Sequence, residues 1–357
     1  MPDCLNVLWL LDSPDHSGTS FAARHLWGGM HRAGHKPAVF AVRNGENARD
    51  FDMVGSPVKI YPHLGRMLLG KSAVRAAADL GVRLVHAQSS DMIPRGKHIA
   101  KALGVPLLVT ANRMDPDELK TLAVFDGKGI IAVSEAIRER LANAHGVPQS
   151  RIRVIPNGLD LSRMPKPDFN GDGASFPGRV PVVGTLGQLA AQKGQRVFLQ
   201  AVRTLIDRGI DAEYVVLGDG PDRPALRSLA EELEIAKRVT FTPQTVSGQL
   251  TQLDVLVEPS LREGLGLSVM QAMAMGVPVV GTGVGGLYSL IEDGKTGLMV
   301  AANDPVGLAD AIERILRDPA ERNEMRRQAR ELVEKEFNAE LVAQRLAEYY
   351  RECLEEA

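Results

Sequence analysis

The chain has 357 residues, 44% of them hydrophobic and 24% charged, and its formal net charge is −2. These values are typical of a globular protein and exclude a strongly basic nucleic-acid-binding chain, and an aromatic content of 4% argues against base-stacking surfaces. The length predicts two domains of about 150 residues each. Cys4 and Cys353 lie far apart in the sequence, so we expect no disulfide framework and no zinc site, which favours a cytoplasmic location.

Short apolar, β-branched runs alternate with helical patterns along the chain. The first run, at 5–11, has no basic segment before it and is too short for a signal peptide, so it predicts a buried strand. Further runs occur at 37–42, 82–87, 106–110, 129–133 and 152–156, and then at 180–186, 212–218, 238–242, 253–259 and 277–282. This alternation predicts an α/β fold of two doubly wound parallel sheets, with ligands at the carboxyl ends of the strands in a cleft between the domains.

Composition predicts where the two domains meet. Residues 164–179 contain three prolines and three glycines without apolar periodicity, which is typical of a linker. We therefore expect a first domain at 1–160, a linker at 161–180 and a second domain at 181–335.

The C-terminal tail predicts at least three helices, separated near Asp318 and Asn338. The last of them carries apolar residues at Leu341, Leu346 and Tyr349. We expect this last helix, within 338–357, to pack back on the first domain.

A long uncharged stretch, 264–291, follows Glu263. It is long enough to cross a bilayer, for which about 20 helical residues suffice. Its glycines, Pro278 and Gln271 would leave polar groups unpaired in lipid, so the stretch predicts a loop, a short buried helix, a buried strand and a second loop.

Three glycine-rich loops follow predicted strands. The segment 281–286 fits the spacing G-x-G-x-x-G, but Gly294 and Gly297 leave no room for the crossover helix of a dinucleotide site. In the loop 184–195, Lys193 is either a phosphate-binding charge or a solvated surface residue. In the loop 262–268, Glu263 would suit the hydroxyls of a sugar, or it pairs with Arg262 or caps the helix.

Taken together, these loops resemble the family 4 retaining glycosyltransferases of the GT-B fold, also described as glycosyl transferases group 1. The resemblance is carried by Lys193, the stretch 217–221, Glu263 with 264–268, and the segments 130–141, 151–163 and 283–300. It covers nearly all of residues 127–335, and the order and spacing of six motifs agree. It implies an acceptor-side first domain and a second domain that binds a nucleotide sugar.

The resemblance assigns site residues one by one. It implies catalytic roles for Glu263 at the donor sugar and Lys193 at the diphosphate. The donor-binding residues that it implies are Gly18, Gln188, Lys193, Gly218, Glu263, Gly264, Leu265, Gly266, Leu267 and Gln271. The residues that it implies near the acceptor or the reacting sugar are His86, Asn112 and Arg113.

Four positions depart from the family pattern, one of which is Ser289, where the family often has a glutamate. Gln271 stands where the family has a second glutamate that binds ribose, and its amide keeps one acceptor oxygen, so we expect ribose binding to weaken modestly. Gln188 stands where an arginine is common, which removes one charge partner of the diphosphate. Asn112 stands where a histidine is usual and cannot act as a general base, while His86 is either a site residue or a satisfied core histidine.

The resemblance also implies a mechanism and partners. It implies retention of anomeric configuration through a front-face displacement in which the departing phosphate takes the acceptor's proton. No metal and no cofactor is expected, and no nucleic acid partner. The expected donor is a nucleoside-diphosphate sugar, with a UDP-sugar favoured, and the acceptor is a saccharide, a lipid-linked saccharide or a small molecule. Such a hexosyltransferase suits cell-envelope polysaccharide biosynthesis.

Basic residues gather in the first domain. From Lys59 to Lys101 there are eight lysines and arginines against Asp79 and Asp91, a local charge of +6. This segment would suit peripheral contact with an anionic membrane on its inner face, or an anionic saccharide. The alternative is that these charges are only the solvated faces of two helices.

Two other functions stay open. The departures at Gln188, Gln271, Asn112 and Ser289 favour a non-catalytic relative that binds a nucleotide sugar. The intact Glu263, Lys193 and glycine loops favour catalysis. A nucleotide-sugar epimerase on the same fold lacks motif support of its own.

Overall fold

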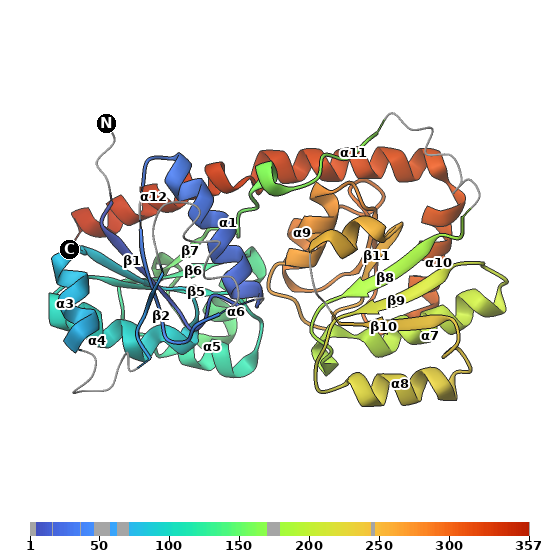
Figure 1. Ribbon diagram of the computed structural model, residues 1–357, viewed down its shortest axis with the longest axis horizontal. Coiled ribbons are helices and arrows are strands. Elements are labelled where there is room, and N and C mark those ends of the chain that lie inside the picture. The colour runs from blue at the N-terminus through green and yellow to red at the C-terminus, as the bar shows by residue number, and fades with distance from the viewer. Residues whose placement is uncertain are drawn as a thin grey trace. The chain divides into compact units, whose positions relative to one another are not determined.

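The computed structural model describes residues 5–15, 17–35, 37–45, 58–62, 71–169, 179–243 and 247–356. The chain divides into two compact units, of which unit 1 comprises Met1–Ser162 with Glu336–Ala357 and unit 2 comprises Arg163–Lys335 (Figure 1). Each unit contains one parallel β-sheet with helices packed against it, so the predicted fold class is confirmed. Within the expected linker, residues 170–178 lie outside the described residues.

The sheet of unit 1 has seven strands in the order β3-β2-β1-β4-β5-β6-β7, all paired in parallel. These strands are β1 (Val7–Leu11), β2 (Ala38–Ala41), β3 (Lys59–Ile60), β4 (Leu84–Ala87), β5 (Leu107–Ala111), β6 (Gly129–Ala132) and β7 (Ile152–Val154). The helices are α1 (Gly18–Arg32), α3 (Lys71–Asp79), α4 (Ile93–Leu103), α5 (Pro116–Ala123), α6 (Glu135–His145) and α12 (Ala339–Glu355). The strand order reverses between β1 and β4, and such a switch point opens a crevice at the carboxyl ends of the strands.

Two tryptophans anchor the core of unit 1. Trp9 on β1 packs edge-on against Trp27 of α1, with ring centroids 5.5 Å apart. Both belong to a buried cluster that α12 completes, and Figure 1 shows α1 and α12 side by side in this unit. The segment that ends the chain therefore belongs to the core of the unit that begins it.

The buried face of α12 differs in part from the one that the sequence predicts. Of the expected residues, Leu346 is buried, whereas Leu341 is 37% exposed, so the expectation for Leu341 was wrong. The reason is the close approach of α1, because a Cβ on Gly29 would lie 2.2 Å from the carbonyl oxygen of Ala339. At its contact with α1, helix α12 therefore buries small residues instead of leucines. The buried residues of α12 are Ala339, Val342, Ala343, Leu346, Ala347, Tyr350 and Cys353.

The sheet of unit 2 has six parallel strands in the order β10-β9-β8-β11-β12-β13. These strands are β8 (Val182–Leu186), β9 (Glu213–Leu217), β10 (Val239–Thr242), β11 (Val255–Glu258), β12 (Val279–Thr282) and β13 (Leu298–Val300). The helices are α7 (Gln195–Asp207), α8 (Arg223–Glu232), α9 (Leu267–Ala274), α10 (Pro305–Arg317) and α11 (Pro319–Glu336), which ends at the boundary between the units.

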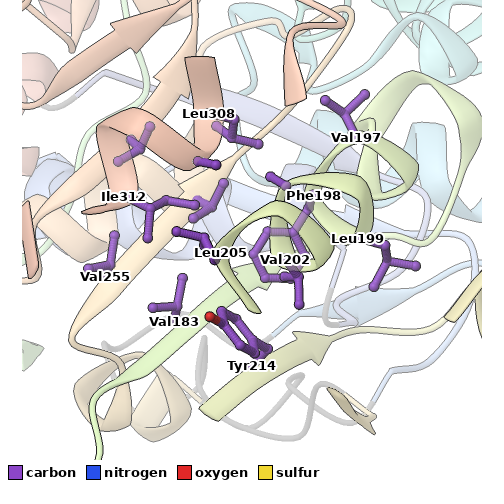
Figure 2. Packing of buried hydrophobic residues seen from close by; sticks show 14 of the residues in the cluster. Val183, Val197, Phe198, Leu199, Val202, Leu205, Tyr214, Val255, Leu308 and Ile312 are labelled. Carbon is purple, nitrogen blue, oxygen red and sulfur yellow. The ribbon is translucent and has the colours of Figure 1, made fainter. Parts of the chain in front are cut away.

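The core of unit 2 forms where α7 and α10 cover the strands (Figure 2). Phe198 and Val202 of α7 point toward Val183 and Tyr214 on neighbouring strands, and all four are fully buried. Because successive strand residues point to opposite faces, β11 buries Leu256 on the other side of the same sheet. A sheet buried on both faces exposes only its strand ends to ligands.

Two strands were not predicted from the sequence. β3 has two residues and β13 has three, and each lies at an edge of its sheet. Runs this short carry too little apolar pattern to be recognised. Among the described residues, no helix is long and apolar enough to cross a membrane.

Candidate functional site

Lys193 lies at the strand ends of unit 2 because of a tight turn. After β8 the chain passes through the 3₁₀ turn η4 (Ala191–Lys193) to Gly194, whose φ is +66°. A Cβ on Gly194 would lie 1.9 Å from the carbonyl oxygen of Pro259. Only glycine tolerates this conformation and this approach, so the turn lies against the end of β11 and brings the Lys193 ammonium to two carboxylates.

The first of these carboxylates is Glu263, in the loop between β11 and α9. One of its oxygens accepts a hydrogen bond from the backbone N–H of Gly264 at 3.1 Å, and the other accepts one from Lys193 Nζ. The loop after β12 supports it, because the N–H of Gly286 donates to the Glu263 carbonyl at 3.1 Å. Glu263 therefore pairs with Lys193 rather than with Arg262, which was one of the alternatives that the sequence left open.

The second carboxylate, Glu258, was missed by the sequence analysis. It is the last residue of β11 and is 2% exposed. Ser260 Oγ donates to its Oε1 at 2.6 Å, Ser268 Oγ donates to its Oε2 at 2.5 Å, and Lys193 Nζ lies 3.8 Å from Oε1. The available signal was a carboxylate closing an otherwise apolar buried strand, with a serine two residues later.

The three charged groups act on one another. Burial lowers the pKa of Lys193, but the carboxylates of Glu258 and Glu263 outweigh it, so the pKa of this amine is raised and the ammonium is kept. Burial raises the pKa of the Glu258 carboxyl, and Glu263 acts in the same direction, while Lys193 and the two serine hydroxyls oppose it. The site thus combines a firmly charged ammonium with a carboxylate that is costly to ionise.

Three further residues expected at the donor also lie in unit 2. Gln188 is exposed on the loop after β8, where its carbonyl accepts a hydrogen bond from Gln195 Nε2 at 3.0 Å. Gly218 follows β9, and its N–H donates to the Thr242 carbonyl at 2.9 Å. Gln271 lies on α9 and is 8% exposed.

The segment directly after Glu263 leads into α9. Gly264, Leu265 and Gly266 are buried, and Gly266 caps the helix with a φ of +99°. Leu267 is the first residue of α9. Helix α9 therefore begins three residues after Gly264, whose N–H bonds the Glu263 carboxylate.

The G-x-G-x-x-G segment at 281–286 does not open a helix of the dinucleotide-binding kind. It leads into a 3₁₀ turn, η6 (Gly285–Ser289), and the chain then enters β13. A Cβ on Gly286 would lie 2.1 Å from the carbonyl oxygen of Gly264. These glycines serve to pack the loop after β12 onto the loop that holds Glu263.

In unit 1, His86 is a satisfied buried histidine. It is 1% exposed on β4, and its Nε2 lies 2.7 Å from Thr110 Oγ1, while its Nδ1 lies 2.6 Å from Tyr350 Oη and 3.1 Å from Gln88 Nε2. Burial lowers the pKa of His86 to about 3. A neutral ring with its proton on Nε2 satisfies this arrangement.

Asn112 and Arg113 follow β5 in unit 1. The Asn112 amide donates to the Gln88 carbonyl at 2.7 Å, and its backbone N–H donates to Glu118 at 3.1 Å. Arg113 is exposed but also donates to Glu118, at 2.5 Å, and lies 3.8 Å from Asp91. Gly18 is exposed at the start of α1, next to the capping residue Ser17.

A small cavity lies at the carboxyl ends of the unit 1 strands. Its volume is about 20 Å³, which is enough for about one water molecule. None of the described residues that line it carries a charge once His86 is neutral. They are Thr19, Ala22, Ala23, Leu26, His86, Gln88, Thr110, Asn112, Ile131, Ile155, Pro156, Asn157 and Leu346. Across the described part of the chain, no cluster of histidines, cysteines or carboxylates has the arrangement of a metal site.

Two family models match this chain. "Glycosyltransferase Family 4" matches residues 16–163, and "Glycosyl transferases group 1" matches residues 180–318. The chain is 31% identical over 289 residues to the D-inositol 3-phosphate glycosyltransferase of Paenarthrobacter aurescens, which covers 72% of this chain and 70% of that protein. The chain therefore belongs to this family of glycosyltransferases.

Another relative matches over a shorter stretch. The alpha-D-kanosaminyltransferase of Streptomyces kanamyceticus is 35% identical over 176 residues, 48% of this chain and 46% of that protein. The chain thus spans about half the length of several curated relatives that it matches.

Solved structures agree on the fold. Anabaena HepE in complex with UDP-glucose superposes with a TM-score of 0.83 at 20% sequence identity, covering 98% of this chain and 100% of that one. Together with the two parallel-sheet units, this likeness establishes the GT-B fold.

Proposed function

We propose that this protein is a retaining glycosyltransferase that moves a hexosyl group from a nucleoside-diphosphate sugar to a hydroxyl of an acceptor. A UDP-sugar is the favoured donor, and the acceptor is a saccharide, a lipid-linked saccharide or a small molecule. The observation that carries the proposal is the ion pair of Lys193 and Glu263 at the strand ends of unit 2. A cation for the diphosphate and a carboxylate for the sugar hydroxyls lie side by side there.

The relatives support this proposal. The Paenarthrobacter relative is named for glycosyl transfer to D-inositol 3-phosphate, and the Streptomyces relative for kanosaminyl transfer. HepE, which has the same fold, is bound to UDP-glucose. These names support sugar transfer and a UDP-sugar donor for this chain.

Donor binding exchanges the partners of Lys193. In the structure, Lys193 donates to Glu263. A diphosphate would draw the ammonium to itself, because charge-assisted bonds to phosphate are among the strongest in proteins. The freed Glu263 carboxylate then accepts hydrogen bonds from hydroxyls of the donor sugar.

The transfer step needs no metal and no covalent intermediate in this proposal. As the bond between the anomeric carbon and the diphosphate oxygen breaks, the acceptor oxygen forms a bond on the same face of the sugar. The acceptor's proton passes to the departing phosphate oxygen, and the configuration is retained. In this proposal the Lys193 ammonium, once it has left Glu263, stabilises the negative charge that develops on the leaving group.

Unit 1 supplies the acceptor side in this proposal. The neutral amides of Gln88 and Asn112 at the strand ends suit sugar hydroxyls, and Arg113 lies next to Asn112 in the chain. In the basic segment of the first domain, Arg66 lies outside the described residues, and the exposed basic residues are Lys59, Lys71, Arg75, Arg83, Lys97 and Lys101. Peripheral contact of a cytoplasmic protein with an anionic membrane through this segment is part of the proposal, and sedimentation with anionic and neutral vesicles tests it.

A panel of UDP-, GDP- and ADP-sugars tests the function. Purified protein is titrated with each donor and assayed for its slow hydrolysis, with Lys193→Ala as the impaired variant. Lys295→Ala is the matched control, because Lys295 is exposed in the same unit and pairs with Glu292. Hydrolysis of one donor supports the transferase, tight binding without turnover supports the non-catalytic alternative, and no binding of any donor contradicts both.

A further inference from the structure

The charge of the Lys193 cluster does not suit a diphosphate. Its ammonium contributes +1 and the carboxylates of Glu258 and Glu263 contribute −2, so the cluster carries −1 when all three are ionised. A nucleoside diphosphate brings further negative charge to the same point. Gln188 adds no cation on the loop after β8. Loss of one negative charge would therefore favour binding of the ligand.

Glu258 is the group that can lose its charge. Its side chain is buried, whereas that of Glu263 is 13% exposed and accepts the bond from Lys193. The groups that act on the Glu258 carboxylate are Lys193 before α7, Glu263 after β11, and the hydroxyls of Ser260 and Ser268. Thr282 on β12 reaches only the Glu258 carbonyl.

The two serines permit both charge states. With Glu258 ionised, both hydroxyls donate to it. With Glu258 protonated, its O–H donates to one serine oxygen, and that hydroxyl rotates toward another acceptor. For Ser260 such an acceptor is present, because its Oγ lies 3.4 Å from Glu263 Oε2.

We propose that Glu258 is a positioning residue that takes up a proton when a nucleoside diphosphate binds. Protonation releases Lys193 from Glu258, so the whole ammonium charge is directed to the diphosphate. The same proton lets Ser260 turn its hydrogen bond toward Glu263 and hold that carboxylate for the sugar. When the nucleotide leaves, Glu258 ionises again and draws Lys193 back. This inference rests on the proposed function, because it needs a diphosphate ligand at Lys193.

Calorimetric titration with UDP tests the inference. Each titration is run in two buffers of different ionisation enthalpy, so that the difference in heat gives the number of protons taken up. The proteins are the wild type, Glu258→Gln, which is a neutral copy of the protonated side chain, and Ser268→Ala. GDP and ADP follow if UDP does not bind.

We expect the wild type to take up about one proton more than Glu258→Gln at pH 8. From pH 7 to pH 9 the wild-type Kd should rise by up to about tenfold per pH unit relative to that of Glu258→Gln. Ionisation of UDP itself contributes equally to both proteins and cancels. Ser268→Ala removes a hydroxyl that favours the carboxylate, so it should raise the proton uptake at pH 9.

The outcomes separate the two proposals. Equal proton uptake and parallel pH profiles in wild type and Glu258→Gln would overturn the role of Glu258 while leaving the transferase intact. If no nucleotide binds to any of the three proteins and all of them are folded by circular dichroism, the transferase proposal fails and the inference falls with it. A merely structural role for Glu258 predicts a lower melting temperature in Glu258→Gln without any change in proton uptake.

Discussion

The two units end their parallel sheets in opposite ways. In unit 2 the strand ends gather an ammonium and two carboxylates that compete for each other. In unit 1 the corresponding ends gather a neutral histidine, amides and hydroxyls that satisfy each other around a cavity for about one water molecule. The shared architecture supplies two sets of strand ends, and their side chains make one set charged and the other neutral.

The two sets of strand ends also differ in how easily their side chains can change partners. Each ring nitrogen of His86 has a partner inside its own unit, so ligand binding gains nothing by moving the histidine. Lys193 is shared between two partners and is 23% exposed, so a stronger anion can recruit it. We therefore expect substitutions in unit 2 to affect turnover and substitutions around His86 to affect stability.

The largest expected effect is the loss of transfer activity when a charged residue at the strand ends of unit 2 is replaced. Lys193→Ala and Glu263→Ala should each lower kcat/KM for transfer by about 100- to 1000-fold, because each removes an electrostatic partner of the transition state. The lysine change should act mainly through donor binding and the glutamate change mainly through kcat. Steady-state kinetics with the best donor measures both, and Lys295→Ala should stay within twofold of wild type. Wild-type rates in either variant would remove that residue from the site.

The next largest effect is on stability, and it tests whether the neutral side chains around His86 in unit 1 have a structural role. Tyr350→Phe leaves the Trp9 indole N–H without its acceptor at 3.0 Å and takes one donor from His86. The loss of stability should be about 2 kcal/mol, the usual cost of an unsatisfied buried group. The sequence holds two tryptophans, Trp9 and Trp27, and both lie in unit 1, so tryptophan fluorescence in urea reports the unfolding of that unit.

The control for this substitution is Tyr288→Phe. Tyr288 is 66% exposed, and its hydroxyl bonds the Gly283 carbonyl, so its removal should cost less than about 0.5 kcal/mol. Equal effects of the two tyrosine substitutions would contradict a special role for the buried hydroxyl.

A smaller effect concerns the pH dependence of unit 1. The pKa of His86 falls from 6.5 to about 3 on folding because the ring is buried, so below pH 6.5 the unfolded chain binds a proton that the folded chain does not. Stability from this group is therefore complete above pH 6.5 and is lost as the pH falls toward 3, by at most about 1.4 kcal/mol per pH unit. His86→Gln should show a flatter curve between pH 6.5 and 5 in urea unfolding.

Glu118 must be considered in that measurement. Burial raises its pKa although Arg113 opposes the shift, so its contribution to stability falls as the pH rises. This sign is opposite to that of His86, but wild type and His86→Gln both retain Glu118, so their difference isolates the histidine. Parallel curves for the two proteins would mean that His86 does not titrate as the structure implies.

The smallest expected effect is on nucleotide affinity, and it tests the role of Gln271 in donor binding. Gln271→Glu should tighten nucleotide binding by up to about tenfold, because a charged acceptor binds ribose hydroxyls more strongly than an amide does. A 2′,3′-dideoxy nucleotide should lose affinity in both proteins and lose more in the variant. If Gln271 is only a buried helix residue, the variant is destabilised and the dideoxy penalty is the same in both. Calorimetric titration of both proteins with both nucleotides distinguishes these outcomes.

Much of the fold was predictable because local patterns decide it. The apolar runs at 82–87 and 253–259 became β4 and β11, and Ser134 caps α6 by accepting a hydrogen bond from the Ile137 N–H. In α12 the burial of Leu346 was predicted correctly and that of Leu341 wrongly, because the contact with Gly29 on α1 depends on how two distant segments approach. Local periodicity contains no information about that approach.

The candidate site was predictable only in part for the same reason. Lys193 and Glu263 were predicted as separate loop residues, but their ion pair depends on the contact of Gly194 with Pro259. Glu258 was missed because its partners come from three elements, and along the chain it is only one charge at the end of an apolar strand. Spatial convergence of this kind has no signature in a single stretch of sequence.

The place of α12 has a consequence for how the chain is made. A ribosome completes all of unit 2 before it begins the helix that closes the core of unit 1. Until then Trp9 and Trp27 lack the cover of Tyr350 and its neighbours, and newly made chains with uncovered apolar surface are prone to aggregate. Unit 2 is continuous in sequence and can fold during synthesis, so the segment made first is the one that matures last. A chain that ends before α12 therefore contains all of unit 2 but lacks the helix that closes the core of unit 1.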